Sequence, residues 1–380
     1  MKNVVLLGST GSIGKQTLDV LRAAPDEFQL LAICACRDTA TLVTQAMEFM
    51  PHYIGVSDEK AAMTLREAQG DIGSELVIGN DAASKLAALP EADVVVNAIS
   101  GFAGMLPLLS ALQAGKTVAL ANKESIVCAH NLVWDALDTC GGRILPIDSE
   151  QSAIFQCLAA TDYRNDVKRL ILTASGGPFR NMSLSEMEKV TPEMALHHPT
   201  WNMGKQITLD SATLFNKGLE IMEAAYLFEI DNIDVLIHPE SIVHSMVEFA
   251  DGSTMAQMSK PDMRLAIAYA LTYPLRAPLG FGALDLAAAG NLSFEKPDTE
   301  RFPAIRLAYE ALADGETLPI VYNAAKEEAS AMFFAGEIGF TDIARRVEYA
   351  MEHNAGGWAR SIEDVLGIDA AARLLARKGK

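Results

Sequence analysis

The chain has 380 residues, of which 50% are hydrophobic and 21% charged, and its formal net charge at pH 7 is -18. This composition excludes a disordered chain, and the length exceeds what one hydrophobic core usually organises, so about two or three domains are expected. The negative charge disfavours nucleic acid and anionic membrane surfaces as partners. Any phosphorylated ligand must therefore meet local positive groups or helix N-termini.

Cysteine usage and the first residues predict the cellular compartment. Five cysteines without a C-x-x-C spacing indicate reduced thiols. The N-terminus enters an apolar strand directly, without a signal-peptide pattern, and no apolar run is long enough to span a bilayer. We therefore expect a cytoplasmic protein with no membrane partner.

The first part of the chain alternates strands and helices. A strand over 4–7 is followed by the run G-S-T-G-S-I-G at 8–14 and by a helix that ends near Ala23, before Pro25. Further strands are predicted over 30–35, 93–99 and 117–121, with helices between them. This order predicts an α/β domain with a parallel sheet.

The glycines at 8, 11 and 14 favour a dinucleotide site. A turn without side chains lets a pyrophosphate approach backbone N–H groups at the helix N-terminus, although a glycine-rich loop of another α/β protein remains the alternative. After the second strand, Arg37 can pair with a 2′-phosphate, which favours NADPH. Asp38 is the residue type that accepts hydrogen bonds from the ribose of NAD, so the cofactor preference stays open.

An acidic segment, Asp148-Ser149-Glu150, follows a strand predicted over 143–147 and precedes a helix predicted over 151–159. Ligands collect at the carboxyl ends of strands in open α/β sheets, so Asp148 and Glu150 are candidate ligands of a divalent cation. The alternative needs no metal, because Asp148 and Gln151 have the spacing of a helix capping box.

A second candidate segment runs from Asp210 to Glu220, with Asp210 as the predicted N-cap of a long helix. Asn216, Lys217 and Glu220 are spaced to project toward one place, although a surface Lys-Glu pair is the simpler alternative. Gly218 costs about 1 kcal/mol inside a helix, so we interpret it as a sign that a ligand approaches the backbone. The segment offers Glu220 to a cation, and it offers a phosphate the donors Ser211, Asn216 and Lys217.

Two loops lie between these acidic segments. After a strand predicted over 169–173, the turn that contains Ser175 leaves N–H groups open to an anion, or is an ordinary turn before Pro178. The stretch 197–204 has no helix or strand period, and it is either a loop that closes over a substrate or a surface loop with buried Trp201.

The remaining chain predicts a hairpin and a helical end. Two strands, over 241–249 and 253–258, flank Asp251-Gly252, and helices are predicted over 304–313, 324–336 and 341–352. We expect a nucleotide-binding domain over 1–147, a domain with the candidate metal ligands over 148–285, a linker over 286–300 and a helical domain over 301–380.

The motifs, taken together in this order, closely resemble the 1-deoxy-D-xylulose 5-phosphate reductoisomerase family. They are G-S-T-G-S-I-G at 8–14, A-N-K-E-S at 121–125, D-S-E at 148–150, S-G-G-P-F at 175–179, H-P-T-W-N-M-G at 198–204 and N-K-G-L-E at 216–220. The resemblance implies a Rossmann-like NADPH domain, an α+β catalytic domain with a mixed sheet and a C-terminal helical bundle. It also implies a homodimer that converts 1-deoxy-D-xylulose 5-phosphate to 2-C-methyl-D-erythritol 4-phosphate in non-mevalonate isoprenoid biosynthesis, with NADPH and Mg²⁺ or Mn²⁺. Catalysis, metal binding and dimerisation would fall to the domain over 148–285.

The same resemblance implies roles for individual residues. The metal ligands would be Asp148, Glu150 and Glu220, which with Lys123 and His198 form the catalytic set. The substrate would also meet Ser149, Ser175, Trp201, Met203, Ser211, Asn216 and Lys217. The cofactor would meet Thr10, Gly11, Ser12, Ile13, Arg37, Asp38, Asn122, Glu124 and Gly204.

Two other classes of protein fit part of this pattern. A homoserine or semialdehyde dehydrogenase would share the first domain but would not explain three acidic ligands beside a phosphate pocket. A non-catalytic dinucleotide sensor would bind cofactor without needing metal.

Overall fold

The computed structural model describes residues 1–161, 164–197 and 204–379. Its backbone contacts divide the chain into two compact units. The first unit contains Met1–Ser125, Leu132–Asp148 and Asp262–Phe281, and the second contains Ile126–Asn131, Ser149–Pro261 and Gly282–Lys380. The finer division of the chain into three domains and a linker stays a prediction.

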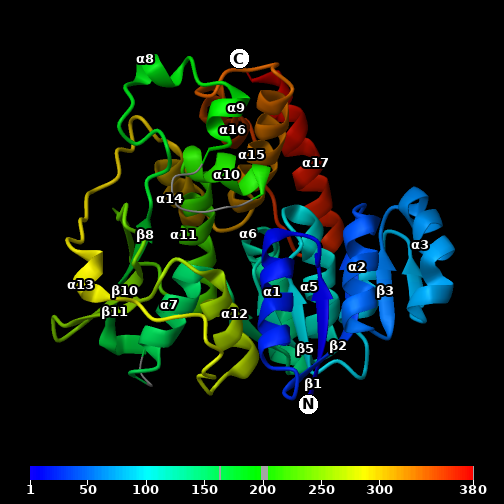
Figure 1. Cartoon of the computed structure of the whole chain (residues 1–380). Helices are drawn as coiled ribbons and strands as arrows, with labels where there is room; N and C mark the ends of the chain where they lie inside the picture. The colour runs from blue at the N-terminus through cyan, green and yellow to red at the C-terminus, as the bar shows by residue number, and fades with distance from the viewer. Residues whose placement is uncertain (162–163, 198–203, 380) are drawn as a thin grey trace. The chain divides into compact units, whose positions relative to one another are not determined.

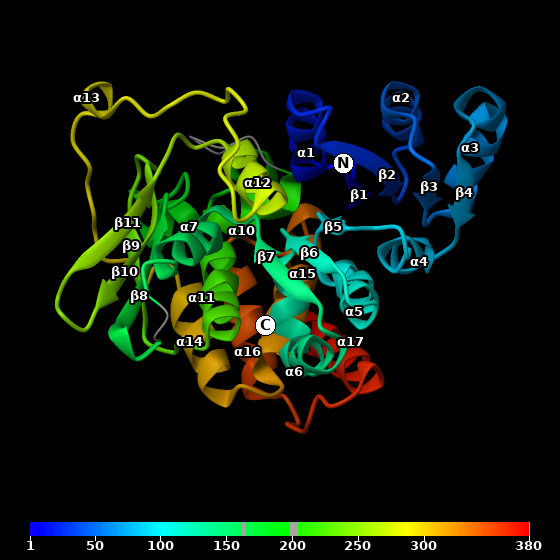
Figure 2. The ribbon, with the colours of Figure 1, turned by 90° about the horizontal axis from the view of Figure 1, so that it is seen from below.

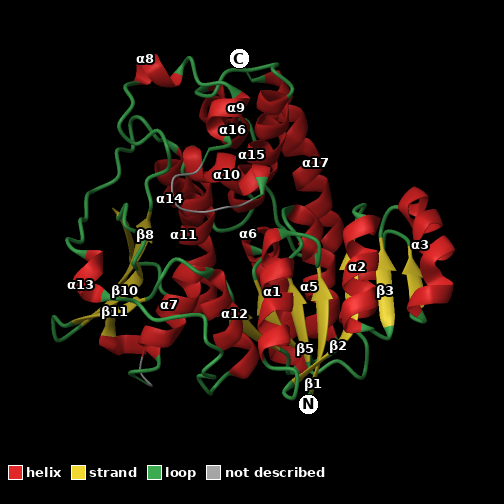
Figure 3. Cartoon of the chain, in the orientation of Figure 1, coloured by secondary structure: helices red, strands yellow, loops and turns green. Residues whose placement is uncertain are grey.

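The first unit is built on a seven-stranded sheet in the order β4-β3-β2-β1-β5-β6-β7, and all its strand pairs are parallel. Figure 3 shows strands β5, β1, β2 and β3 of this sheet side by side. Its central strands are short apolar runs buried on both faces, as helix-covered parallel sheets require. The predicted parallel sheet is confirmed, but its short strands β3 and β4 were not predicted. The strands are β1 (Lys2–Leu7), β2 (Phe28–Ala35), β3 (Tyr53–Val56), β4 (Glu75–Ile78), β5 (Val94–Asn97), β6 (Thr117–Leu120) and β7 (Arg143–Pro146).

The strand order places β1 between β2 and β5, so the chain leaves β1 toward one side of the sheet and later returns on the other. In open α/β sheets ligands bind outside the carboxyl end of such a strand. The glycine turn at 8–14 follows β1 directly, and it leads into α1 (Ser12–Ala23) (Figure 1). The fold therefore puts the candidate dinucleotide turn at the topological switch point.

Helices connect the strands of this unit, and one further helix, from a distant part of the sequence, packs against them. Helix α12 (Met263–Thr272) packs against α1, β6 and β7 (Figure 2). Lys2 Nζ donates to the carbonyl oxygen of Leu271 at 2.9 Å, and the Arg143 guanidinium lies 4.7 Å from the Tyr273 ring centroid. The remaining helices are α2 (Thr39–Phe49), α3 (Glu59–Ile72), α4 (Ala82–Ala87), η1 (Phe102–Gly104), α5 (Met105–Gln113), α6 (Lys123–Cys140), whose middle belongs to the second unit, and α12 (Met263–Thr272).

The second unit contains a mixed four-stranded sheet in the order β11-β10-β8-β9. Strands β8 and β9 are parallel, and the other pairs are antiparallel. Strands β10 and β11 form the hairpin predicted around Asp251-Gly252, where Gly252 has a φ of 87°. The strands are β8 (Val167–Ala174), β9 (Ile233–Ile237), β10 (Val243–Phe249) and β11 (Thr254–Met258).

Helices pack around this sheet and form the C-terminal bundle. The core joins Leu170 and Leu172 of β8 to Phe215 and Leu219 of α11 and to Tyr322 of α15. The predicted α/β class, with a parallel sheet, a mixed sheet and C-terminal helices, is confirmed. The helices are α7 (Ser149–Leu158), η2 (Arg164–Asp166), α8 (Leu184–Met187), α9 (Pro192–Ala195), α10 (Lys205–Ala212), α11 (Phe215–Phe228), α13 (Leu286–Ala289), α14 (Ala304–Asp314), α15 (Leu318–Phe334), α16 (Asp342–Glu352) and α17 (Ile362–Lys378).

The prediction that Asp210 is the N-cap of a long helix is wrong. Asp210 lies inside α10, and the chain breaks at Leu214 before α11 begins. Leu214 has a φ of 61°, which is unusual for a bulky residue, and its side chain is buried. Burial of Leu214 therefore outweighs the local preference of aspartate for the N-cap position.

None of the helices in the described ranges combines the length and the apolar character needed to cross a bilayer.

Candidate functional site

The start of α7 places the first acidic segment. Strand β7 ends at Pro146 and α7 begins at Ser149, so Asp148 and Glu150 flank the helix start. Asp148 is paired with Lys123, whose Nζ lies 3.1 Å from Oδ2 of the carboxylate. Gln151 does not act in a capping box there, because its Oε1 accepts no hydrogen bond. Its Nε2 instead donates at 2.9 Å to the backbone carbonyl of Glu220 and so ties α7 to α11.

Three carboxylates form a cluster that could hold a cation. Each of Asp148, Glu150 and Glu220 offers one oxygen, and these oxygens all lie within 4.8 Å of one another. The Glu220 side chain is fully buried. Three hard oxygen donors of this kind suit Mg²⁺ or Mn²⁺ better than zinc.

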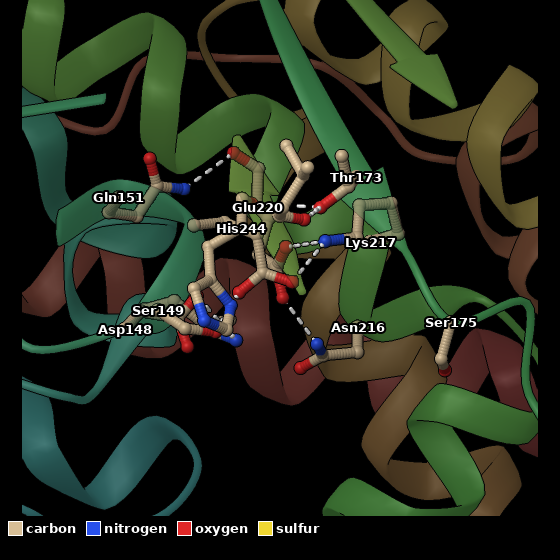
Figure 4. A network of polar contacts seen from close by, with 12 residues as sticks. Asp148, Ser149, Gln151, Thr173, Ser175, Asn216, Lys217, Glu220 and His244 are labelled. Atoms are coloured by element: carbon tan, nitrogen blue, oxygen red, sulfur yellow. Dashed lines mark hydrogen bonds and ion pairs between the residues drawn. The ribbon is translucent and has the colours of Figure 1, made fainter. Parts of the chain in front are cut away.

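A buried lysine lies against the two glutamates. Lys217 Nζ donates to Glu150 Oε1 at 2.8 Å and also to a carboxylate oxygen of Glu220 (Figure 4). Burial by itself lowers the pKa of Lys217, but the two carboxylates more than offset this, so its pKa is raised and the ammonium stays charged. Asn216 donates to Glu220 as well. The first turn of α11 therefore gathers these groups as their spacing predicts, and the Lys-Glu pair is buried rather than on the surface.

Glycine is required at position 218 for a different reason from the predicted approach of a ligand. A Cβ atom at this glycine would overlap the hydroxyl of Tyr322 and lie 3.1 Å from the carbonyl oxygen of Ala304. The close approach that requires glycine is therefore made by α15 and not by a ligand. The interpretation of Gly218 as a mark of ligand binding is wrong, because the partner comes from a helix that local sequence cannot reveal.

The Ser-Gly-Gly turn after β8 packs on the end of α10. Gly176 and Gly177 have φ values of 83° and 67°, and a Cβ on Gly177 would lie 2.7 Å from the carbonyl oxygen of Ser211. The turn therefore brings the backbones that carry Ser175 and Ser211 together. Ser175 itself lies apart from the cluster of Lys217 and Glu220 (Figure 4).

The glycine turn of the first unit is sterically closed to side chains. A Cβ on Gly8 would lie 2.5 Å from the carbonyl oxygen of Ala98, and one on Gly14 would overlap the backbone of Gly8 and Ser9. Gly11 is the N-cap of α1 and makes no side-chain cap, so the first N–H groups of this helix point toward a turn that carries little bulk. This arrangement fits a pyrophosphate, and Thr10, Ser12 and Ile13 lie on the same turn.

The side chains after β2 have separate contacts. Arg37 is 82% exposed, and its Nε lies 3.3 Å from Oδ2 of Asp58. Asp38 caps α2 by accepting from the backbone N–H of Thr41 at 3.1 Å, and hydrogen bonds from Thr41 lower the pKa of this carboxylate. The ion pair of Asp58 with Arg37 was not predicted, although the position of this acidic residue shortly after a parallel strand was an available signal.

Asn122 organises the loops beside β5 and β6. Its Oδ1 caps α6 by accepting from the Ser125 N–H at 2.9 Å, and its Nδ2 donates to the carbonyl oxygens of Ile99 at 2.7 Å and Gly101 at 2.8 Å. The same Nδ2 lies 2.9 Å from a carboxylate oxygen of Glu124. Both side chains are buried, so their structural role is clear, and their contact with a cofactor stays a prediction.

Two residues of the predicted closing loop, His197 and Gly204, lie among the described residues. Gly204 is the exposed N-cap of α10. The predicted residues His198, Trp201 and Met203 lie outside the described residues.

These features define an α/β enzyme that combines a dinucleotide-type turn at a switch point with a carboxylate cluster that could hold a cation beside a buried lysine. Comparison with known proteins then identifies its family. Three family models match: 1-deoxy-D-xylulose 5-phosphate reductoisomerase over residues 4–130, the C-terminal domain of that enzyme over 144–228, and the DXP reductoisomerase C-terminal domain over 258–375. The chain belongs to the 1-deoxy-D-xylulose 5-phosphate reductoisomerase family.

Individual relatives of this family match the chain along its whole length. The 1-deoxy-D-xylulose 5-phosphate reductoisomerases of Chlorobaculum tepidum and Pelotomaculum thermopropionicum are both 48% identical, over 100% of this chain and 99% and 98% of theirs. Among solved structures, the Zymomonas mobilis enzyme in complex with NADPH has a TM-score of 0.92 at 43% identity, covering 99% of this chain and 98% of that one. A DOX-P reductoisomerase with NADPH, fosmidomycin and magnesium has a TM-score of 0.93 at 38% identity, covering 100% and 98%. Full-length membership of this family argues against the other dehydrogenase classes and the non-catalytic sensor.

Proposed function

We propose that this chain converts 1-deoxy-D-xylulose 5-phosphate to 2-C-methyl-D-erythritol 4-phosphate with NADPH and Mg²⁺ or Mn²⁺, in the non-mevalonate route to isoprenoid precursors. The observation that carries the proposal is the carboxylate cluster of Asp148, Glu150 and Glu220 in a full-length member of this family. Solved relatives were crystallised with NADPH and with magnesium, which supports the same pair of cofactors here.

The metal-ligand roles fall to Asp148, Glu150 and Glu220. A bound divalent ion would act as a Lewis acid on substrate oxygens while the carbon skeleton rearranges to an aldehyde, and NADPH would supply the hydride that reduces it. Lys123 holds Asp148 through its ion pair, and Gln151 holds the backbone of Glu220. Both contacts orient the ligand set before substrate arrives, which lowers the cost of reorganisation.

The phosphate of the substrate would be held by Ser175, Ser211, Asn216 and Lys217. Lys217 is charged and buried, and a phosphate that replaces a carboxylate as its partner keeps that charge compensated. Because this contact is remote from the reacting carbons, its binding energy is available to orient the substrate and to close the segment with His198, Trp201 and Met203 over it. Ser149 would contact the substrate backbone.

The nucleotide would lie on the turn of Thr10, Gly11, Ser12 and Ile13. Arg37 would bind the 2′-phosphate of NADPH, and Asp38, Asn122, Glu124 and Gly204 would complete the cofactor site. The sterically closed glycine turn supports the pyrophosphate position. The exposed guanidinium of Arg37 supports selectivity for NADPH.

We also propose a homodimer located in the cytoplasm. Strand β11 is an edge strand whose first residues are exposed, and an edge of this kind offers unpaired backbone groups to a second chain. The three-part division into nucleotide-binding, catalytic and helical domains belongs to the same proposal.

The test is turnover by the purified protein, followed by the oxidation of NADPH. Activity is expected only when 1-deoxy-D-xylulose 5-phosphate and Mg²⁺ or Mn²⁺ are both present, and chelation is expected to stop it. Glu150→Gln is expected to abolish turnover, whereas Glu352→Gln, at an exposed glutamate ending α16, should leave it intact. Turnover without metal, or none with this substrate, would refute the proposal.

A further inference from the structure

Helix α15 of the C-terminal bundle presents two fully buried polar side chains to the helices of the proposed phosphate site. Tyr322 and Lys326 lie one helical turn apart, so they project from the same face of α15. Tyr322 contacts α11, and Lys326 contacts α10. Neither residue is a proposed ligand of substrate, metal or cofactor.

Lys326 makes a buried ion pair beside a proposed phosphate ligand. Its Nζ lies 2.9 Å from Oδ2 of Asp210, and Asp210 also accepts from Nε2 of Gln206 at 3.0 Å. The next residue along α10 is Ser211. The ion pair therefore fixes α10 at the residue that precedes a predicted phosphate donor.

Tyr322 fixes the neighbouring helix in the same way. Its hydroxyl donates to the carbonyl oxygen of Ala304 at 3.0 Å and fills the space that a side chain at Gly218 would need. Gly218 directly follows Lys217. One face of α15 therefore contacts both helices at positions adjacent to Ser211 and Lys217.

The link between the two helices explains why they need external support. Leu214 joins α10 to α11 with a left-handed backbone conformation that costs roughly 1–3 kcal/mol for such a residue, and it persists only where surrounding structure over-determines it. The Ser-Gly-Gly turn packs on the backbone of Ser211, so any shift of α10 also shifts that turn. The geometry of the phosphate donors thus depends on where α15 holds α10 and α11.

Stability alone does not require a charged pair at this place. Replacing a buried ion pair by well-packed apolar residues is often neutral or stabilising, because two charges must be desolvated. A charge-assisted hydrogen bond differs from apolar packing in that it is directional. Such a bond from Lys326 sets the position of Asp210 more narrowly than apolar contact would.

We propose that Lys326 is a positioning residue for substrate phosphate, acting through Asp210 on Ser211 and on the first turn of α11. The proposal rests on the proposed function, since it concerns the same phosphate site. It extends that site to a helix of the C-terminal bundle that contributes no predicted ligand.

The experiment removes both charges together, so that neither is left buried without its partner. In the full-length protein, Lys326→Met/Asp210→Leu is expected to raise the KM for 1-deoxy-D-xylulose 5-phosphate roughly tenfold or more, while kcat changes less. Calorimetric titration with inorganic phosphate should show a similar loss of affinity. The Kd for NADPH and the melting temperature should stay close to those of the wild type. If this variant does not fold, Lys326→Met/Asp210→Asn takes its place with the same expectations.

The control is Arg377→Met, which removes another ion pair of α15, the one with Glu328. It should leave both the KM and phosphate affinity unchanged. A double variant that keeps the wild-type KM and phosphate affinity would overturn the proposal, whatever its melting temperature. A wild-type protein that fails to turn over this substrate would instead refute the proposed function, and the phosphate titration would still decide the role of Lys326.

Discussion

Lys217 donates a hydrogen bond from Nζ to Oε1 of Glu150 at 2.8 Å, so a proposed phosphate ligand and a proposed metal ligand are in direct contact. The ammonium also compensates the buried carboxylate of Glu220. Cation binding by the glutamates and phosphate binding by the lysine are therefore linked, because each changes the charge that the other group faces.

The first prediction follows from this contact. Lys217→Met removes the charge that competes with a metal ion for Glu150 and Glu220, so Mn²⁺ should bind about tenfold more tightly without substrate, a change of about 1.4 kcal/mol. The KM for substrate should rise. Electron paramagnetic resonance of free Mn²⁺ measures the first effect, and Lys205→Met, at an exposed lysine of α10, is the control. Weaker Mn²⁺ binding in the variant would contradict the linkage.

The second prediction concerns pH. His130 stacks on Tyr226 at a centroid distance of 4.2 Å, and burial lowers the pKa of this histidine from 6.5 to about 4. Below pH 6.5 His130 is protonated in the unfolded chain but stays neutral in the folded chain. The free energy of unfolding therefore falls as the pH drops from about 6.5 toward 4, and then levels off.

Urea unfolding measures this dependence. Between pH 7 and pH 5 the contribution of His130 should be a loss of at most about 2 kcal/mol, and His130→Phe should remove it while keeping the stacked ring. His52→Phe, at an exposed histidine, is the control. Equal pH dependence in wild type and His130→Phe would show that the ring is not kept neutral by burial.

The third prediction tests the packing of α11 on α15. Gly218→Ala places a methyl group where the Tyr322 hydroxyl lies, so it should destabilise the fold by about 1–3 kcal/mol, despite the better helix propensity of alanine. Tyr322→Phe should recover part of this loss, because it removes the atom in closest contact. A double-mutant cycle of urea unfolding measures the coupling, and purely additive effects would be evidence against the contact.

The fourth prediction addresses cofactor selectivity. Arg37→Ala should raise the KM for NADPH roughly tenfold or more, since a hydrogen bond to a charged group contributes about 1.5–3 kcal/mol, and should leave the KM for NADH unchanged. Initial rates with the two cofactors measure the ratio. Asp58→Asn keeps the guanidinium and should keep the preference for NADPH. A parallel rise for both cofactors would place Arg37 outside the 2′-phosphate site.

The sequence by itself predicted the elements that depend on local pattern. The apolar runs and glycine turn of the first unit predicted a parallel sheet with α1 directly after β1, and Asp251-Gly252 predicted the hairpin of β10 and β11. The spacing of Asn216, Lys217 and Glu220 correctly predicted that their side chains converge, because helix periodicity is a local property.

Tertiary structure alone decided what lies opposite each of these groups. It showed that Tyr322 rather than a ligand occupies the space at Gly218, that Asp210 pairs with Lys326 inside α10, and that Gln151 holds the backbone of Glu220. In two of these pairs, Gly218 with Tyr322 and Asp210 with Lys326, the partners lie more than a hundred residues apart in the sequence. Local periodicity and propensity cannot predict contacts between residues so far apart. The packing of distant helices determines these contacts, because burial of a side chain such as Leu214 outweighs the local backbone preference.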